Sequence, residues 1–495
     1  MRFSAPRRMF GLVAAAAVAC AVAACDRRDD SAPAVVVIGA APRLADPDVR
    51  PLSPGEAVLL ANVAQGLVRF DARGQIEPGL AERWTVSDDG LSYIFRLAKA
   101  EWPSGRKISA QQVARLLKQA AAANGGNALG DTLGAVDEIV AMTDRVLEIR
   151  LKAPRPNLLQ LLAQPELALV REGEGAGPFR LAKRPVEGGA LRLRRSVPGP
   201  DGDDERREEV LLAGATARDA VRRFAAGEID LVVGGTFADL PHARAVKLKR
   251  RTLQFDPVAG LFGLAVVRKS GPLEAVEVRH LLAQAIDRDA LIAALDVPGL
   301  VPRATVLEGG LEGIAEAPQP PWLATPLAER RLALVAAADR LFCKLERPLL
   351  RIALPDGPGA DQLLARLAAD WSVLGIRVER AGKGGPSDLR LVDRVAPSTS
   401  PAWFVRHFRC GTSALCDAEI DALLDAARAA PVAAQRAALL ADAARRIDKL
   451  QPFLPIAAPI RWSLVSPRIE GFAGNRFGRH TLTALGDRLN RERAE

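Results

Sequence analysis

The sequence predicts an α/β protein with more than one domain. Its 495 residues, 49% hydrophobic and 26% charged, have ordinary globular composition and exceed the usual length of one domain. Residues 34–39 (AVVVIG) form a short β-branched run that suits a strand buried on both faces of a sheet. Farther along, an expected strand at 348–354, a helix at 362–374 and a strand at 375–378 follow one another. This alternation is typical of α/β domains.

The N-terminus has the composition of an export signal. Three arginines precede an apolar, alanine-rich stretch over residues 9–24, which is short for a membrane-spanning helix. The stretch ends in the letters VAAC, which resemble a bacterial lipobox. This resemblance predicts a signal peptide over 1–24, followed by a lipidated Cys25 and a polar tether over 25–33. Plain secretion after an Ala-x-Ala site is the alternative.

The stretch from residue 66 to 118 indicates a hairpin unit followed by a helix. Asp89-Gly90 is a strong hairpin signal, and residues 91–97 follow as a strand with alternating apolar side chains. Ser109 is expected to cap a helix, with Gln112 completing a capping box. These patterns predict local structure and carry no chemistry.

Several short motifs follow one another along the chain. They are GLV at 66–68, PGLAE at 78–82, Trp84, SDDGL at 87–91, SAxxV at 109–113, GAGPFRL at 175–181 and VRxxLxxAIDRxxL at 278–291. Each motif is weak alone, but their order and spacing resemble the extracellular solute-binding proteins, family 5, of peptide-type ABC importers.

The resemblance implies a two-lobed periplasmic-binding-protein fold with a hinge and an extra hairpin-rich domain inserted in lobe I. The expected parts are lobe I over 34–52, 168–262 and 464–495, the inserted domain over 53–167, and lobe II over 263–463. It also implies a monomer, lipid-anchored at the membrane and facing the periplasm, that captures a peptide or small solute. The protein would pass this solute to a membrane permease served by a separate ATPase.

Other functions receive less support from the sequence. The ligand could instead be a nickel chelate, an opine, a sugar or haem, and a sensor or orphan lipoprotein with a degenerate cleft is a further alternative. No motif for catalysis, phosphate binding, a cofactor or a metal is found, so we expect no enzyme. The formal charge is +9, but the charges are interspersed, which argues against a nucleic-acid partner.

Cys410 and Cys416 are close enough in sequence to close a small loop, and export permits a disulfide. Some dipeptide-binding relatives are similar in carrying such a pair. His407 lies three residues earlier, so a metal cluster is the alternative, although it lacks a fourth ligand. We predict the disulfide. Cys343 follows apolar residues and is expected to be buried.

Asp393 is the sharpest candidate for ligand binding. In peptide-binding relatives an Asp, followed four residues later by Pro and then by an aromatic residue, holds the ligand's ammonium. Asp393, Pro397 and Trp403 are similar to this pattern, and an ammonium without water requires a carboxylate. However, the gap before the aromatic residue is longer here. An alignment on Ser400-Pro401 would remove the acid, and Asp393 could merely begin a turn.

Four further residues are candidates for the cleft. Trp403 could present an aromatic surface, and Arg406 could bind a ligand carboxylate through two parallel hydrogen bonds. Ala41 and Arg43 follow the first buried strand, and open α/β sheets bind ligands beyond the carboxyl ends of their strands.

Overall fold

Three sheets of four or more strands organise the part of the chain that the structure describes. The structure is a computed structural model and describes residues 32–487 apart from 123–125, 185, 187–188, 199–204, 318 and 344–345. The expected signal peptide and Cys25 therefore lie outside the described residues. None of the helices within those ranges is long and apolar enough to cross a membrane.

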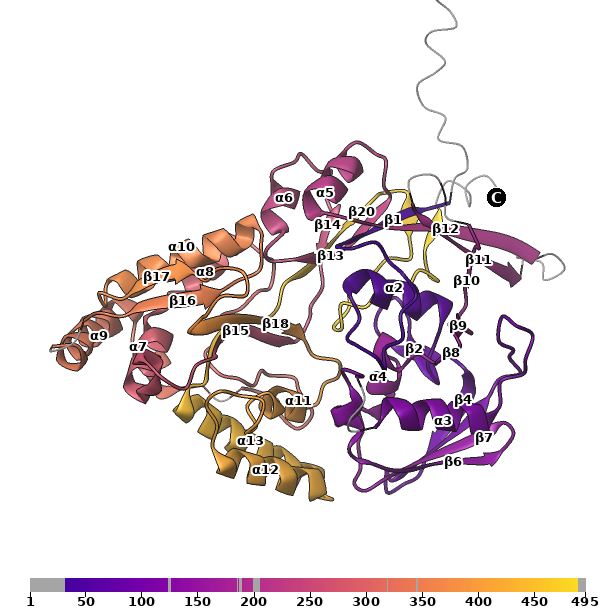
Figure 1. Cartoon of the computed structure of the whole chain (residues 1–495), viewed down its shortest axis with the longest axis horizontal. Helices are drawn as coiled ribbons and strands as arrows, with labels where there is room; N and C mark the ends of the chain where they lie inside the picture. Colours follow the sequence, from indigo (N-terminus) through magenta and orange to yellow (C-terminus); the bar gives the residue numbers. More distant parts are fainter. Residues whose placement is uncertain are drawn as a thin grey trace, which may run out of the picture.

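The first sheet has seven strands and is built around β1 (Ala34–Ile38) (Figure 1). β1 runs parallel to both of its neighbours. Val35 and Val37 face one apolar cluster with α2 (Pro54–Val63), whereas Val36 and Ile38 face another with α5 (Ala217–Ala225). Both faces are covered, which explains the β-branched run. In order, the strands are β10 (Arg180–Leu181), β11 (Leu191–Pro198), β12 (Glu205–Ala215), β1, β13 (Leu231–Thr236), β20 (Arg461–Val465) and β14 (Leu253–Phe255).

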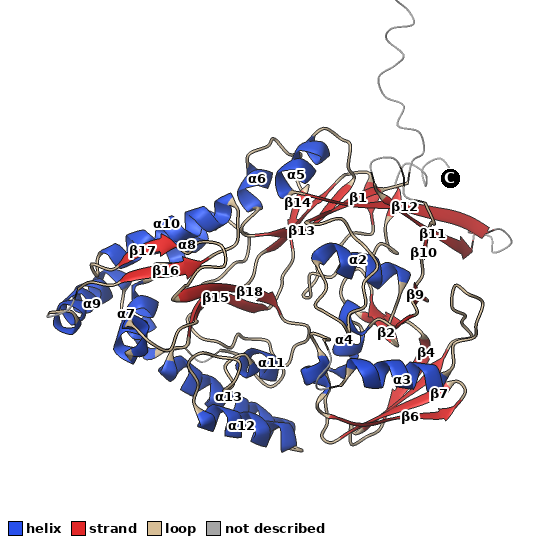
Figure 2. Cartoon of the chain, viewed as in Figure 1, coloured by secondary structure: helices blue, strands red, loops and turns tan. Residues whose placement is uncertain are grey.

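The second sheet has five strands in the order β17 (Arg377–Arg380), β16 (Leu349–Ala353), β18 (Leu389–Val395), β15 (Gly260–Val266) and β19 (Phe453–Ala457). Figure 2 shows helices on both of its sides. One side carries α7 (Val276–Ala285), α8 (Arg288–Leu295), α9 (Leu327–Leu341) and α10 (Pro358–Ser372). The other carries α11 (Pro401–Arg406), α12 (Ala418–Ala429) and α13 (Ala433–Leu450).

The third sheet contains the hairpin unit that the sequence predicts. The order is β4 (Ala81–Val86), β5 (Ser92–Leu97), β7 (Val146–Leu151) and β6 (Val136–Thr143), and α3 (Ala110–Ala120) packs on β6 and β7. Gly90 occupies the turn before β5 with a φ of +68°, a conformation that favours glycine. Ser109 and Gln112 form the expected capping box. Shorter elements complete the region: β2 (Val68–Phe70), β3 (Ile76–Pro78), α4 (Leu158–Leu162), β8 (Val170–Arg171) and β9 (Glu174–Gly175).

The two larger sheets form two lobes joined by a pair of chain crossings. The chain passes from β14 to β15 between residues 255 and 260, and returns from β19 to β20 between 457 and 461. An edge-to-face contact of 4.9 Å between Phe237 and Phe262 links the lobes through one continuous core. The predicted two-lobed α/β class is therefore confirmed, and the segment boundaries stay predictions. The described residues end with a short pair of strands, β21 (Ile469–Glu470) and β22 (Gly486–Asp487).

Candidate functional site

A cavity of about 570 Å³ lies between the two lobes. On one side it is walled by the end of β1, the start of α2 and β13; on the other by the segment after β18 and by α11. Residues 477–481 near the C-terminus close a third side. The carboxyl ends of parallel strands β1 and β13 face this space, as expected for an open α/β sheet. The volume is suited to a small organic solute.

Asp393 lies on the wall of this cavity, where the sequence analysis expects it. Its carboxylate is already held by Arg461, whose Nη1 donates to Oδ1 at 2.8 Å and to Oδ2 at 3.1 Å. Burial raises the pKa of Asp393, and the guanidinium of Arg461 acts in the opposite direction. Arg461 also donates to the carbonyl oxygens of Ile460 and Asp393. The two side chains therefore form a fixed unit at the junction between β18 and β20.

Trp403 and Arg406 both line the cavity from α11. Trp403 is only 6% exposed, because it packs edge-to-face on Phe404 at 5.0 Å and on His407 at 4.6 Å. His407 Nδ1 lies 2.7 Å from the carbonyl oxygen of Trp403, which orients the imidazole. Trp403 is thus largely a core residue that presents one edge to the cleft. A binding role for either candidate remains a prediction.

Ala41 and Arg43 are exposed and do not belong to the wall of this cavity. Arg43 is 74% exposed, and its Nε donates to Oε1 of Glu56 at 2.8 Å. Glu56 also binds Arg50 and completes the capping box of α2 with Ser53, and these donors hold its pKa well below the usual range. The cavity is instead lined here by β1 itself and by the start of α2.

A set of contacts across the cleft involves residues that the sequence analysis did not single out. Gln164 Nε2 donates to the carbonyl oxygen of Pro397 at 2.7 Å, and Asn157 Nδ2 donates to Ser398 Oγ at 2.9 Å. The amide of Thr399 donates to Gln160 Oε1 at 2.9 Å. These bonds join the α4 region of one side to the segment after β18 on the other, so the chain is in a closed conformation.

Beside these contacts, the two sides enclose a second cavity of about 110 Å³. Arg155 lines it and donates to the carbonyl oxygen of Arg428 at 2.9 Å. Burial, together with the nearby charge of Arg436, lowers the pKa of Arg155 to about 10. No sequence pattern could have indicated these pairs, because their members are more than two hundred residues apart.

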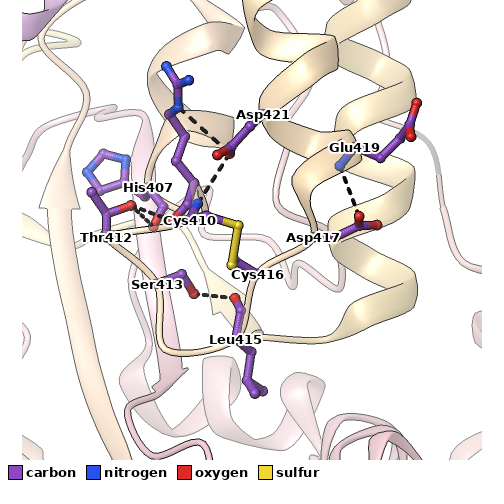
Figure 3. Close-up of a disulfide and its surroundings, with 10 residues drawn as sticks. His407, Cys410, Thr412, Ser413, Leu415, Cys416, Asp417, Glu419 and Asp421 are labelled. Atoms are coloured by element: carbon purple, nitrogen blue, oxygen red, sulfur yellow. Dashed lines mark hydrogen bonds and ion pairs between the residues drawn. A yellow bond between two sulfur atoms is a disulfide. The ribbon is translucent and has the colours of Figure 1, made fainter.

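Cys410 and Cys416 form a disulfide with a Cα–Cα distance of 5.1 Å, which confirms that prediction (Figure 3). The disulfide uses both thiols that the alternative, a metal cluster, would need as ligands. The loop ends at Asp417, whose carboxylate accepts from the amide of Glu419 and caps α12. Asp421 accepts from the amide of Cys410 and so ties the loop to the same helix. The expectation for Cys343 is wrong: its side chain is exposed, because it follows the end of α9.

Comparisons with known proteins place the chain among binding proteins. The family model for bacterial extracellular solute-binding proteins, family 5, matches residues 75–385. A probable di/tripeptide-binding protein of Pseudomonas aeruginosa is 26% identical over 475 residues, covering 85% of this chain and 89% of that protein. Alignments with two Bacillus subtilis relatives, an oligopeptide-binding and a dipeptide-binding protein, span about half of each relative's length, 48%.

Two solved structures share the fold. The murein tripeptide binding protein MppA of Escherichia coli matches with a TM-score of 0.78 at 18% identity, covering 93% of this chain and 99% of that one. Haemophilus influenzae OppA in complex with the peptide RPPGFSPFR matches with a TM-score of 0.75 at 19% identity, covering 92% and 99%. With the matched family model and the two-lobed fold around an interlobe cavity, the chain belongs to the bacterial extracellular solute-binding proteins, family 5.

Proposed function

We propose that this protein is the exported binding component of an ABC importer, which captures a peptide or peptide-like solute between its lobes. The observation that carries the proposal is the cavity of about 570 Å³ enclosed by both lobes. Contacts from the α4 region to the segment after β18 bridge the two lobes in this structure. A solute that touches both lobes would favour this closed state. The names of the relatives, with their di-, tri- and oligopeptides, support a peptide as the solute.

The closed protein would then dock on a membrane permease, whose ATPase subunits supply the energy for import. In this role the chain carries out no catalysis itself. We propose that Cys25 is lipidated and anchors the protein at the membrane. Labelling of the protein with radioactive palmitate, which is lost in Cys25→Ser, would test the anchor. A protein that is equally unlabelled in both forms would argue for plain secretion.

Native mass spectrometry of the protein purified from the bacterial periplasm tests the ligand class most directly. We expect a bound peptide or peptide-like molecule, which collisional activation should release so that its mass can be measured. A metal chelate, an opine, a sugar or a haem released in its place would overturn the peptide assignment while leaving the binding role intact.

A cavity-filling variant tests whether the interlobe cavity is the binding site. Ala61 lines the cavity on α2, so Ala61→Trp should block it. Ala422 is exposed on α12, and Ala422→Trp is the matched control. At one hundred times the Kd, a ligand stabilises the wild type by about 2.7 kcal/mol. We expect the ligand-induced rise in melting temperature to be lost in Ala61→Trp and kept in Ala422→Trp. If both variants keep it, the ligand binds elsewhere.

A further inference from the structure

The ionisable residues on the wall of the interlobe cavity are mostly cationic. Five arginines and two acids line it: Arg69, Arg394, Arg406, Arg461 and Arg479 against Glu166 and Asp393. A peptide with a free amino terminus would bring an ammonium into this space. An ammonium that leaves water needs a carboxylate partner. Whether the cavity can bind an ammonium therefore depends on whether Glu166 or Asp393 is available to pair with it.

Both acids of the wall are already bound to arginine. Asp393 uses both oxygens to accept from Nη1 of Arg461, at 2.8 and 3.1 Å. Glu166 accepts from Nη2 of Arg479 through Oε1 at 2.6 Å, and its Oε2 is buried without a hydrogen-bond partner among the described residues. An ammonium at either carboxylate would lie next to a guanidinium of the same charge.

Arg461 is held in place by more than this ion pair. Its Nη1 also donates to the carbonyl oxygen of Ile460 at 2.9 Å, and its Nη2 contacts the carbonyl oxygen of Asp393 at 3.4 Å. Arg479 is likewise fixed, because its Nε donates to Oε1 of Gln164 at 3.0 Å. Neither guanidinium can leave its carboxylate without breaking additional hydrogen bonds. The pairs are therefore part of the wall that a ligand meets.

We infer that Arg461 prevents Asp393 from holding an ammonium, and that the cleft selects organic anions: peptide-like solutes that carry carboxylates and lack a free amino terminus. This inference rests on the proposed function and narrows its ligand class. Arginine suits the task, because its planar donors match a carboxylate through two parallel hydrogen bonds. His407 and His480 also line the cavity. They are oriented by the carbonyl oxygen of Trp403 and by Asp256, respectively.

Three probes that differ only at the amino terminus test this selectivity: trialanine, N-acetyl-trialanine and N-succinyl-trialanine. Isothermal titration of the full exported protein at pH 7 should give the succinyl form at least a tenfold lower Kd than trialanine, with the acetyl form between them. In Arg461→Gln, trialanine should gain at least tenfold and the succinyl form should weaken. A wild type that binds trialanine as tightly as the succinyl form would overturn the inference.

Two control variants distinguish the effect of the positive charge at residue 461 from general damage to the fold. Arg461→Lys keeps a cation beside Asp393 and should keep the wild-type order of the three probes. Arg268 pairs with Asp388 at 3.1 Å outside the cavity, so Arg268→Gln should leave all three affinities unchanged. A loss of the order in Arg268→Gln would contradict a local effect of Arg461.

The outcomes also distinguish this inference from the proposed function. If no probe binds the wild type but trialanine binds Arg461→Gln, peptides are not its ligands, while the blocking role of Arg461 stands. If no probe binds either protein, both the peptide assignment and the inference fail.

Discussion

Residues 66–118 and residues 389–407 each contain a strand followed by a helix. The polar side chains of the two regions differ in how far away in the sequence their hydrogen-bond partners lie. In the first, Ser109 pairs with Gln112, and Ser87 Oγ donates to Asp89 two residues away. In the second, Asp393 pairs with Arg461, and Ser398 accepts from Asn157, 241 residues away. The caps and turns of the first region thus use partners that are near in sequence, whereas the second region depends on the other lobe being in place. Substitutions in the two regions should therefore differ in whether they affect folding or closure.

The largest effect is expected in the first region, residues 66–118. Trp102 is 2% exposed, and its Nε1 donates to Oε1 of Gln112 at 3.2 Å. Trp102→Ala should lower the free energy of unfolding by about 3–5 kcal/mol, because it leaves a cavity and removes the hydrogen bond to Gln112. Urea denaturation followed by circular dichroism measures this loss. Trp84→Ala is the control, since Trp84 is only partly buried and should cause a smaller loss.

Trp102→Ala protein that is still folded should bind ligand with the wild-type affinity, because Trp102 does not line the interlobe cavity. A weakened affinity in the folded variant would contradict the independence of the two regions.

Asp448 forms a hydrogen bond with a residue that is far away in the sequence, and the carboxyl of Asp448 can titrate. Its carboxyl accepts from the amide of Val306 at 3.2 Å, 142 residues away, and burial raises its pKa to about 7 from the ordinary 3.8. Between pH 4 and 7 the folded state keeps this proton while the unfolded state releases it. Stability from this group therefore falls as pH rises to 7 and is constant above that.

Asp448→Asn removes this dependence and keeps an acceptor for Val306. Relative to the wild type, we expect it to gain up to a few kcal/mol above pH 7, at about 1.4 kcal/mol per pKa unit. The difference should shrink to nothing near pH 4, and urea titrations at several pH values measure it. A difference that stays constant from pH 4 to 8 would show that the carboxyl does not titrate in this range.

Gln164 tests the closure contacts directly. It is 1% exposed and donates to the carbonyl oxygen of Pro397 at 2.7 Å across the cleft. Gln164→Ala should weaken the closed state by about 1–2 kcal/mol, because the carbonyl oxygen of Pro397 loses this donor. Small-angle scattering should then report a larger radius of gyration without ligand. Gln119, exposed on α3, provides the control Gln119→Ala, which should leave the radius unchanged.

The same difference in distance explains what the sequence could predict. The Asp89-Gly90 turn, the Ser109 cap and the buried β1 strand each depend on neighbouring residues, so their patterns are visible in the sequence. The chemistry of Asp393 makes it a candidate from sequence alone, but its partner Arg461 cannot be predicted, because the two residues lie on strands of different sheets and meet only through the arrangement of the two lobes. Their place after the first buried strand makes Ala41 and Arg43 candidates, but neither lines this cavity, and Arg43 binds Glu56 instead; a binding role for them stays a prediction.

Substitution of Ser109 is expected to have the smallest effect on stability, and it tests hydrogen bonding between residues that are close in the sequence. Its side chain accepts from the amide of Gln112, while the Gln112 side chain accepts from the amide of Ser109. Ser109→Ala should cost about 1 kcal/mol, the usual value for losing a helix N-cap. Ser104 is exposed in the preceding turn, and Ser104→Ala should change stability by less than about 0.5 kcal/mol. Equal effects at the two serines would mean that α3 is held by its packing on β6 and β7 rather than by its cap.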